Sequence, residues 1–73
     1  MHEDMQAICD ALCRTLQKTS FFYDLIELKY ITENDYRQRV RAIFPGGYVY
    51  VNVTGDSGWA MVYDIVKQLP RKI

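Results

Sequence analysis

The sequence lacks an excess of charge of either sign: nine Lys and Arg residues balance nine Asp and Glu residues, and the formal net charge at pH 7 is zero. A neutral chain has no overall field that draws it to nucleic acid or to an anionic membrane, so such binding requires a local patch. Long apolar runs are also absent, since none approaches the roughly 20 residues that span a bilayer. Residues 1–12 carry acids where a secretory signal carries Lys or Arg. These absences predict a cytoplasmic protein that does not bind membranes.

Glycine, proline, histidine and cysteine are scarce. With four Gly, two Pro and 49% hydrophobic residues, the composition indicates a single globular domain over residues 1–73. A domain of this length buries only about 60% of the surface of its unfolded chain. Cys9 and Cys13 stand four apart, which puts both thiols on one helix face and suits a disulfide poorly. We expect reduced core thiols and no metal or other cofactor, because a zinc site needs more ligands and His2 is the only histidine.

Residues 55–58 read Gly-Asp-Ser-Gly, the residues that surround the nucleophile of trypsin-like serine proteases. A serine nucleophile needs a general base within hydrogen-bond reach, and the single histidine stands near the N-terminus. We instead expect Gly55 to turn the chain and Asp56 or Ser57 to cap a helix. The sequence therefore predicts a protein that is not an enzyme.

In three segments the apolar residues recur with a clear period. Residues 3–18 and residues 57–69 each predict an amphipathic helix, the second with its apolar stripe on Trp59, Val62, Val66 and Leu69. Residues 48–54 alternate strictly, which predicts a strand with one buried face. The valines Val49, Val51 and Val53 then face the core, and Tyr48 and Tyr50 face outward.

The pattern of residues 21–44 predicts secondary structure less clearly. In residues 21–30 the spacing of Phe21, Leu25 and Leu28 favours a helix, whereas the aromatic and branched side chains favour a strand. For residues 33–44 a helix is predicted, with Thr32 as the N-cap and Pro45 at its end. The fold expected is a mainly helical α+β domain in the order helix, helix, helix, strand, helix. The alternative is a small βαβ-like fold with residues 21–30 as a second strand.

A strand without a partner cannot satisfy its backbone groups. If residues 21–30 are helical, strand 48–54 must pair with the same strand of a second copy, which predicts a homodimer.

The stretch LIELKYITENDYRQRVRAIF, residues 25–44, combines a Leu-rich amphipathic turn, an Ile-Thr-Glu start and a basic helix. It resembles the short helical hairpins of the SHOCT type found in small bacterial, phage and mobile-element proteins. The resemblance implies a docking or oligomerisation hairpin over residues 21–44 and no catalytic activity. It also suggests an accessory or counter-defence protein of a phage or mobile element.

The function expected is a non-enzymatic protein–protein interaction module, because six tyrosines exceed what so small a core needs. The predicted contact residues, for a protein partner or a second copy, are Tyr48, Tyr50, Trp59, Arg37 and Arg41. The alternative is a small DNA-binding regulator of helix-turn-helix outline that uses helix 33–44. Its nucleic-acid contacts would be Lys29 and Arg39 on phosphate and, on bases, Asn34, Arg37, Gln38 and Arg41.

Overall fold

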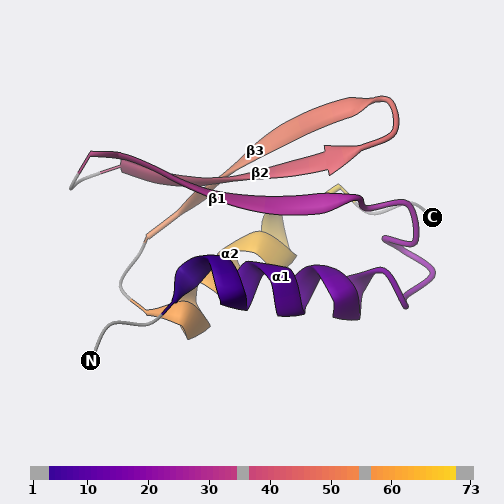
Figure 1. Cartoon of the computed structure of the whole chain (residues 1–73), viewed down its shortest axis with the longest axis horizontal. Coiled ribbons are helices and arrows are strands. Elements are labelled where there is room, and N and C mark those ends of the chain that lie inside the picture. The colour runs from indigo at the N-terminus through magenta and orange to yellow at the C-terminus, as the bar shows by residue number, and fades with distance from the viewer. Residues whose placement is uncertain (1–3, 35–36, 55–56, 71–73) are drawn as a thin grey trace.

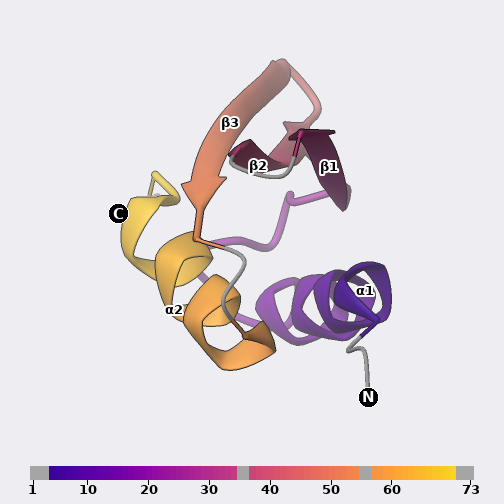
Figure 2. The ribbon, with the colours of Figure 1, turned by 90° about the vertical axis from the view of Figure 1, so that its left-hand side faces the viewer.

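Two helices cover one face of a three-stranded antiparallel sheet in the computed structural model (Figure 1). The structure describes residues 4–34, 37–54 and 57–70. The elements follow in the order α1 (Met5–Leu16), β1 (Glu27–Asn34), β2 (Arg37–Phe44), β3 (Gly47–Val53) and α2 (Gly58–Gln68). Seen from the end, both helices lie side by side beneath the sheet, and its opposite face has no helix over it (Figure 2). The molecule is therefore a two-layer α+β domain.

The predicted helices over residues 21–30 and 33–44 are wrong, and so is the mainly helical fold class. Residues 17–24 form turns and bends, and after residues 25 and 26 the chain continues into β1 and β2. The alternative, a βαβ-like fold with residues 21–30 as a second strand, is also wrong: a strand does begin at Glu27, but β2 follows it instead of a helix. A period of two explains the difference: Val40 and Ala42 are fully buried, while Arg39 and Arg41, which alternate with them, face the other side of the sheet. Cross-strand pairing therefore outweighs the local capping signal at Thr32.

The strand predicted over residues 48–54 is confirmed as β3, but its expected pairing across a homodimer is wrong. It pairs antiparallel with β2 of the same chain, from Gln38 opposite Val53 to Phe44 opposite Gly47. Pro45 and Gly46 form the turn of this hairpin instead of ending a helix. Gly47 follows with a φ of 149°, a backbone conformation that residues with a side chain rarely adopt. The backbone of β3 is thus satisfied on one side within the chain.

The helices predicted at the two ends of the chain are confirmed as α1 and α2. Asp4 caps α1 by accepting a hydrogen bond from the Ala7 amide, and the Ser57 hydroxyl accepts one from the Ala60 amide at the start of α2. Ser57 therefore does what the capping interpretation expects, whereas the turn expected at Gly55 and Asp56 lies outside the described residues. No helix among the described residues is long and apolar enough to cross a membrane.

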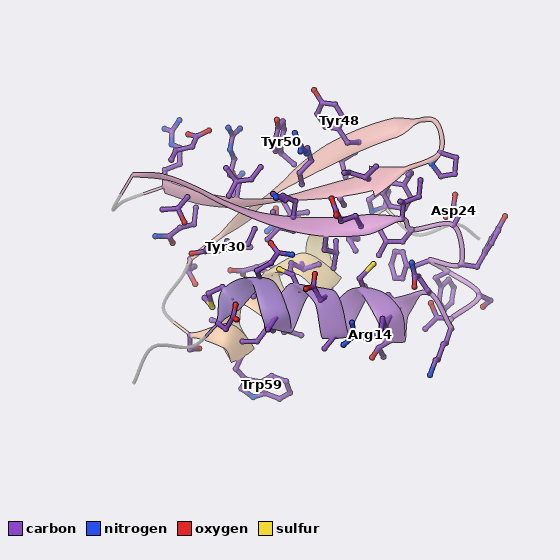
Figure 3. All side chains as sticks on the ribbon, in the orientation of Figure 1. Arg14, Asp24, Tyr30, Tyr48, Tyr50 and Trp59 are labelled. Atoms are coloured by element: carbon purple, nitrogen blue, oxygen red, sulfur yellow. The ribbon has the colours of Figure 1, made fainter. Side chains whose placement is uncertain are left out.

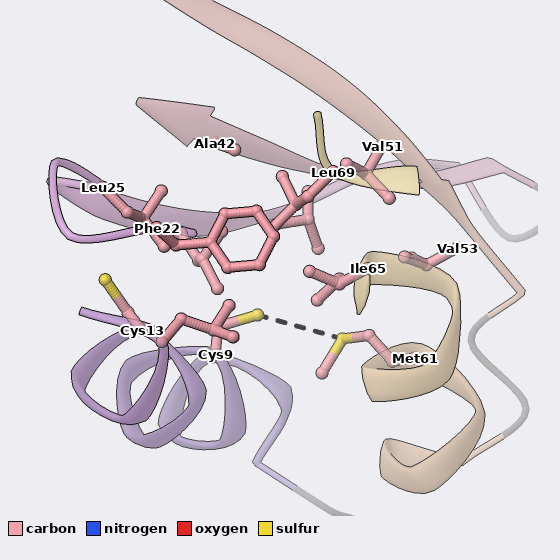
Figure 4. Packing of buried hydrophobic residues seen from close by; sticks show 13 residues of the cluster. Cys9, Cys13, Phe22, Leu25, Ala42, Val51, Val53, Met61, Ile65 and Leu69 are labelled. Atoms are coloured by element: carbon pink, nitrogen blue, oxygen red, sulfur yellow. Dashed lines mark hydrogen bonds between the residues drawn. The ribbon is translucent and has the colours of Figure 1, made fainter. Parts of the chain in front are cut away.

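The core lies between the sheet and the helices (Figure 4). Its fully buried side chains include Leu28 from β1, Val40 from β2, Val51 from β3 and Cys9 from α1; α2 contributes Met61 and Ile65. Of the predicted stripe only Leu69 is buried, so the side of α2 that packs against the core is not the predicted one. Met61, Ile65 and Leu69 face the core, while Trp59 is 83% exposed. Two apolar stripes run along this helix, and the one without Trp packs against the sheet.

Both cysteines are buried and unpaired, as expected, and the described residues contain no group of side chains that could hold a metal ion. The Cys9 thiol donates to Met61 Sδ over 3.9 Å, which joins the two helices through the core (Figure 4). Burial, with a smaller contribution from Asp10, raises the pKa of the Cys9 thiol from 9.0 to about 11, and burial also raises that of Cys13. These thiols stay protonated wherever the protein is folded at neutral pH.

We expect the free energy of unfolding to fall as the pH rises from 9.0 to about 11. Below this window Cys9 is protonated in both states; within it the unfolded chain ionises Cys9 while the folded chain keeps the proton. The shift corresponds to a loss of about 3 kcal/mol. Urea titrations across this range measure the slope, and Cys9→Ala is the control because it removes the titrating group. A difference between wild type and Cys9→Ala that does not change with pH would contradict the prediction.

Candidate functional site: an arginine–tyrosine cluster on the uncovered sheet face

The face of the sheet opposite the helices brings together charged and aromatic side chains from all three strands. The register places Arg41 of β2 between Lys29 of β1 and Tyr50 of β3, and Arg39 between Ile31 and Asn52. Because alternate residues of a strand point to the same face, Tyr48 lies beside Tyr50 on this side. Figure 3 shows both tyrosines standing on the side of the sheet away from the helices. We call Arg39, Arg41, Tyr48 and Tyr50 the Arg/Tyr cluster.

The four side chains of the Arg/Tyr cluster contact one another. The Arg39 guanidinium lies 4.3 Å from the centre of the Tyr50 ring, and that of Arg41 lies 5.7 Å from the centre of the Tyr48 ring. The two rings meet edge to face, with centroids 5.4 Å apart and an interplanar angle of 77°. Such cation–π and edge-to-face contacts hold side chains in fixed positions on an otherwise open surface. Tyr48 and Tyr50 still expose 58% and 44% of their surface.

The charges on this face are not balanced. Arg39 forms an ion pair with Glu33, but Arg41 has no acidic partner among the described residues and stands directly opposite Lys29. Like charges directly opposite each other on neighbouring strands destabilise a sheet. The Nε atoms of both cluster arginines are also buried without a hydrogen-bond partner in the described part of the chain. An anionic group placed near Arg41 and Lys29 would relieve this repulsion.

A second exposed surface lies on the other side of the molecule. Trp59 and Tyr63 of α2 are exposed and, with Val62 and Val66, line a shallow apolar groove. Figure 3 shows Trp59 pointing away from the sheet, on the side opposite Tyr48 and Tyr50. The predicted contact residues thus divide between two faces: Trp59 lies on the helical face, while Tyr48, Tyr50 and Arg41 lie on the sheet face.

The remaining predicted site residues fall on strands. Arg37 begins β2, and the alternation puts it on the same face as Arg39 and Arg41. Gln38 lies on the core side of β2, and Asn34 ends β1. The helix that was expected to read DNA bases with these residues is absent, because residues 37–44 form a strand in the middle of the sheet. The helix-turn-helix outline is therefore wrong.

Sequence reasoning missed the partnership of Arg39 with Tyr50 and of Arg41 with Tyr48. On a helix Arg39 lies on a different side from Arg37 and Arg41, whereas on β2 all three share one face. The signal that could have found them is the alternation of arginines with Gln38, Val40 and Ala42.

Comparison of the chain with protein-family models, with curated proteins and with solved structures finds no match. The suggested origin in a phage or mobile element stays a prediction.

Proposed function

We propose that this protein is a non-enzymatic interaction module that uses the Arg/Tyr cluster to bind an acidic segment of a partner protein. The observation that carries the proposal is the placement of Arg41 directly opposite Lys29, beside two exposed tyrosines, on a sheet face that neither helix covers. Carboxylates of a partner would supply the missing negative charge, and the tyrosine rings would supply apolar contact area. Tyrosine and arginine are the residue types that contribute most to protein interfaces.

The geometry favours a protein partner over a single-stranded nucleic acid. Bases stack on open aromatic faces, but Tyr48 and Tyr50 meet edge to face, and Arg39 lies over the ring of Tyr50. We place this function in the cytoplasm.

Binding of a short fluorescein-labelled peptide of alternating Glu and Val tests the proposal, with anisotropy measured at low and at moderate salt. We expect the Glu/Val peptide to bind, the matching Lys/Val peptide not to bind, and the affinity to fall as salt screens the charges. The double variant Arg39→Glu/Arg41→Glu should weaken binding at least about tenfold, because it puts like charges against the peptide.

The matched control is Arg14→Glu, since Arg14 is an exposed arginine on α1, on the far side of the sheet from the cluster (Figure 3). It changes the net charge in the same direction and by half as much, since one arginine is replaced instead of two, so an effect of long-range charge alone would appear in this variant at about half the size. Equal binding of the Glu/Val and Lys/Val peptides, an unchanged affinity in the double variant, or tighter binding of an oligothymidine than of the Glu/Val peptide would each contradict the proposal.

A further inference from the structure

We infer that the acidic partner segment binds as an additional β-strand on the open edge of β3, at Tyr48–Tyr50. The inference rests on the proposed function and specifies how the partner binds. It starts from Asn52, whose amide donates to Gln68 Oε1 over 3.2 Å and whose carbonyl accepts from Gln68 Nε2 over 2.8 Å. These two groups point away from β2. Since backbone groups of alternate residues in a strand point the same way, those of Tyr50 and Tyr48 also face the open edge.

The two edges of the sheet differ in how far a helix closes them. Along β1 the side chain of Gln6 accepts from the Tyr30 amide over 2.8 Å and donates to the Leu28 carbonyl over 3.0 Å. Gln17, the C-cap of α1, and Cys13, on α1, donate to the carbonyls of Leu25 and Ile26 just before β1. This edge is therefore occupied by side chains of α1 and its C-cap from Leu25 to Tyr30.

Along β3 the helix closes only the end of the strand. Gln68 bonds to Asn52, and Asp64 accepts from the Thr54 amide over 3.1 Å. The outward backbone groups of Tyr48 and Tyr50 have no partner among the described residues. An unpaired edge of this kind is a template for a further strand, and an extended chain is the ligand that pairs with its donors and acceptors together.

The side chains around this edge determine which strand fits. On the outer face the guanidinium of Arg39 extends over the ring of Tyr50, toward the open edge, and favours an acidic residue on the incoming strand. On the other face Val49 is 37% exposed at the same edge, so the intervening residue of the incoming strand should be apolar. Alternating acidic and apolar residues match both faces. The occupant is therefore an extended partner segment with this alternation, and Gln68 closes the edge beyond Tyr50.

Two N-methylated forms of the Glu/Val peptide test the inference, one methylated on the amides of all Glu residues and one on those of all Val residues. In an added strand every second residue turns its N–H group toward β3, and the residues between them turn theirs to solvent. We expect antiparallel addition, which places the Glu amides against Tyr48 and Tyr50. Methylation of Glu should then abolish measurable binding, and methylation of Val should change the affinity less than about threefold. If only the peptide methylated on its Val amides fails to bind, the strand is added in the parallel direction.

Amide hydrogen exchange gives an independent readout on the protein itself. Saturation with the unmethylated peptide should slow exchange at Tyr48 and Tyr50 at least about tenfold, and leave the amide of Asn52, already bonded to Gln68, nearly unchanged.

The failure of this inference differs from that of the proposed function. If the unmethylated peptide binds, but both methylated forms bind alike and the Tyr48 and Tyr50 amides gain no protection, the added strand is wrong and the acidic-segment proposal stands. If the unmethylated peptide does not bind, both are wrong.

Discussion

Replacing Leu28 with Ala is expected to lower the free energy of unfolding by about 3 kcal/mol, within the range found for buried leucines. The Leu28 side chain is fully buried on β1, in the cluster that joins the sheet to both helices. Its truncation removes apolar contacts and leaves a cavity that the surrounding strands can only partly close. For a domain with a total stability near 5 kcal/mol, the variant would retain less than half of it.

Urea titration followed by circular dichroism measures the effect of Leu28→Ala as a lower midpoint at an unchanged slope. The matched control is Ile26→Ala, two residues earlier, where the same number of side-chain carbons is removed from a residue that is 55% exposed. We expect the control to lose less than about 1 kcal/mol. Equal losses in the two variants would show that Leu28 does not lie in the core.

Gln6→Ala should cost about 2 kcal/mol, although the side chain lies at the edge of the sheet rather than in its core. The change removes the two hydrogen bonds through which Gln6 satisfies the Tyr30 amide and the Leu28 carbonyl. Both bonds are partly buried, so the backbone groups left behind lose part of their access to water. Gln17→Ala removes one such bond, to the Leu25 carbonyl, and should cost about half as much.

The variant Gln6→Glu separates hydrogen bonding from the loss of side-chain volume. At neutral pH a carboxylate can accept from the Tyr30 amide but cannot donate to the Leu28 carbonyl, whereas a protonated carboxyl can do both. Its stability relative to the wild type should therefore rise as the pH is lowered from neutral. A Gln6→Ala variant within about 0.5 kcal/mol of the wild type would contradict this account of the edge.

The sequence predicted the elements whose period is unambiguous. The face of α1 that carries Cys9 and Cys13 and the alternation of β3 were correct, because each segment fits one period only. Residues 27–44 fit both a helix and a strand over short windows, and a plausible cap at Thr32 favoured the helix. In the folded chain β2 lies between β1 and β3, and pairing on both sides decides its conformation. A single sequence carries little information on such pairing.

The candidate site was predictable in part. The alternation of residues 48–54 correctly placed Tyr48 and Tyr50 on the outer face of the sheet. The contact of Arg41 with Tyr48 and its position opposite Lys29 depend on the register of three strands, which no local pattern specifies. Trp59 was assigned to the wrong side of α2, because the helix carries two apolar stripes and only packing selects between them.

The hydrogen bonds of Gln6 to the edge of β1 limit how copies of this chain can assemble through their sheets. Open-ended growth of a sheet through copies of one chain requires each copy to offer two edges, one to accept the previous copy and one to receive the next. Here Gln6, with its neighbours on α1, occupies one of them. A strand bound at Tyr48–Tyr50 would therefore extend the sheet in a single direction, and the chain would act as a terminus rather than as a repeating unit of a fibre.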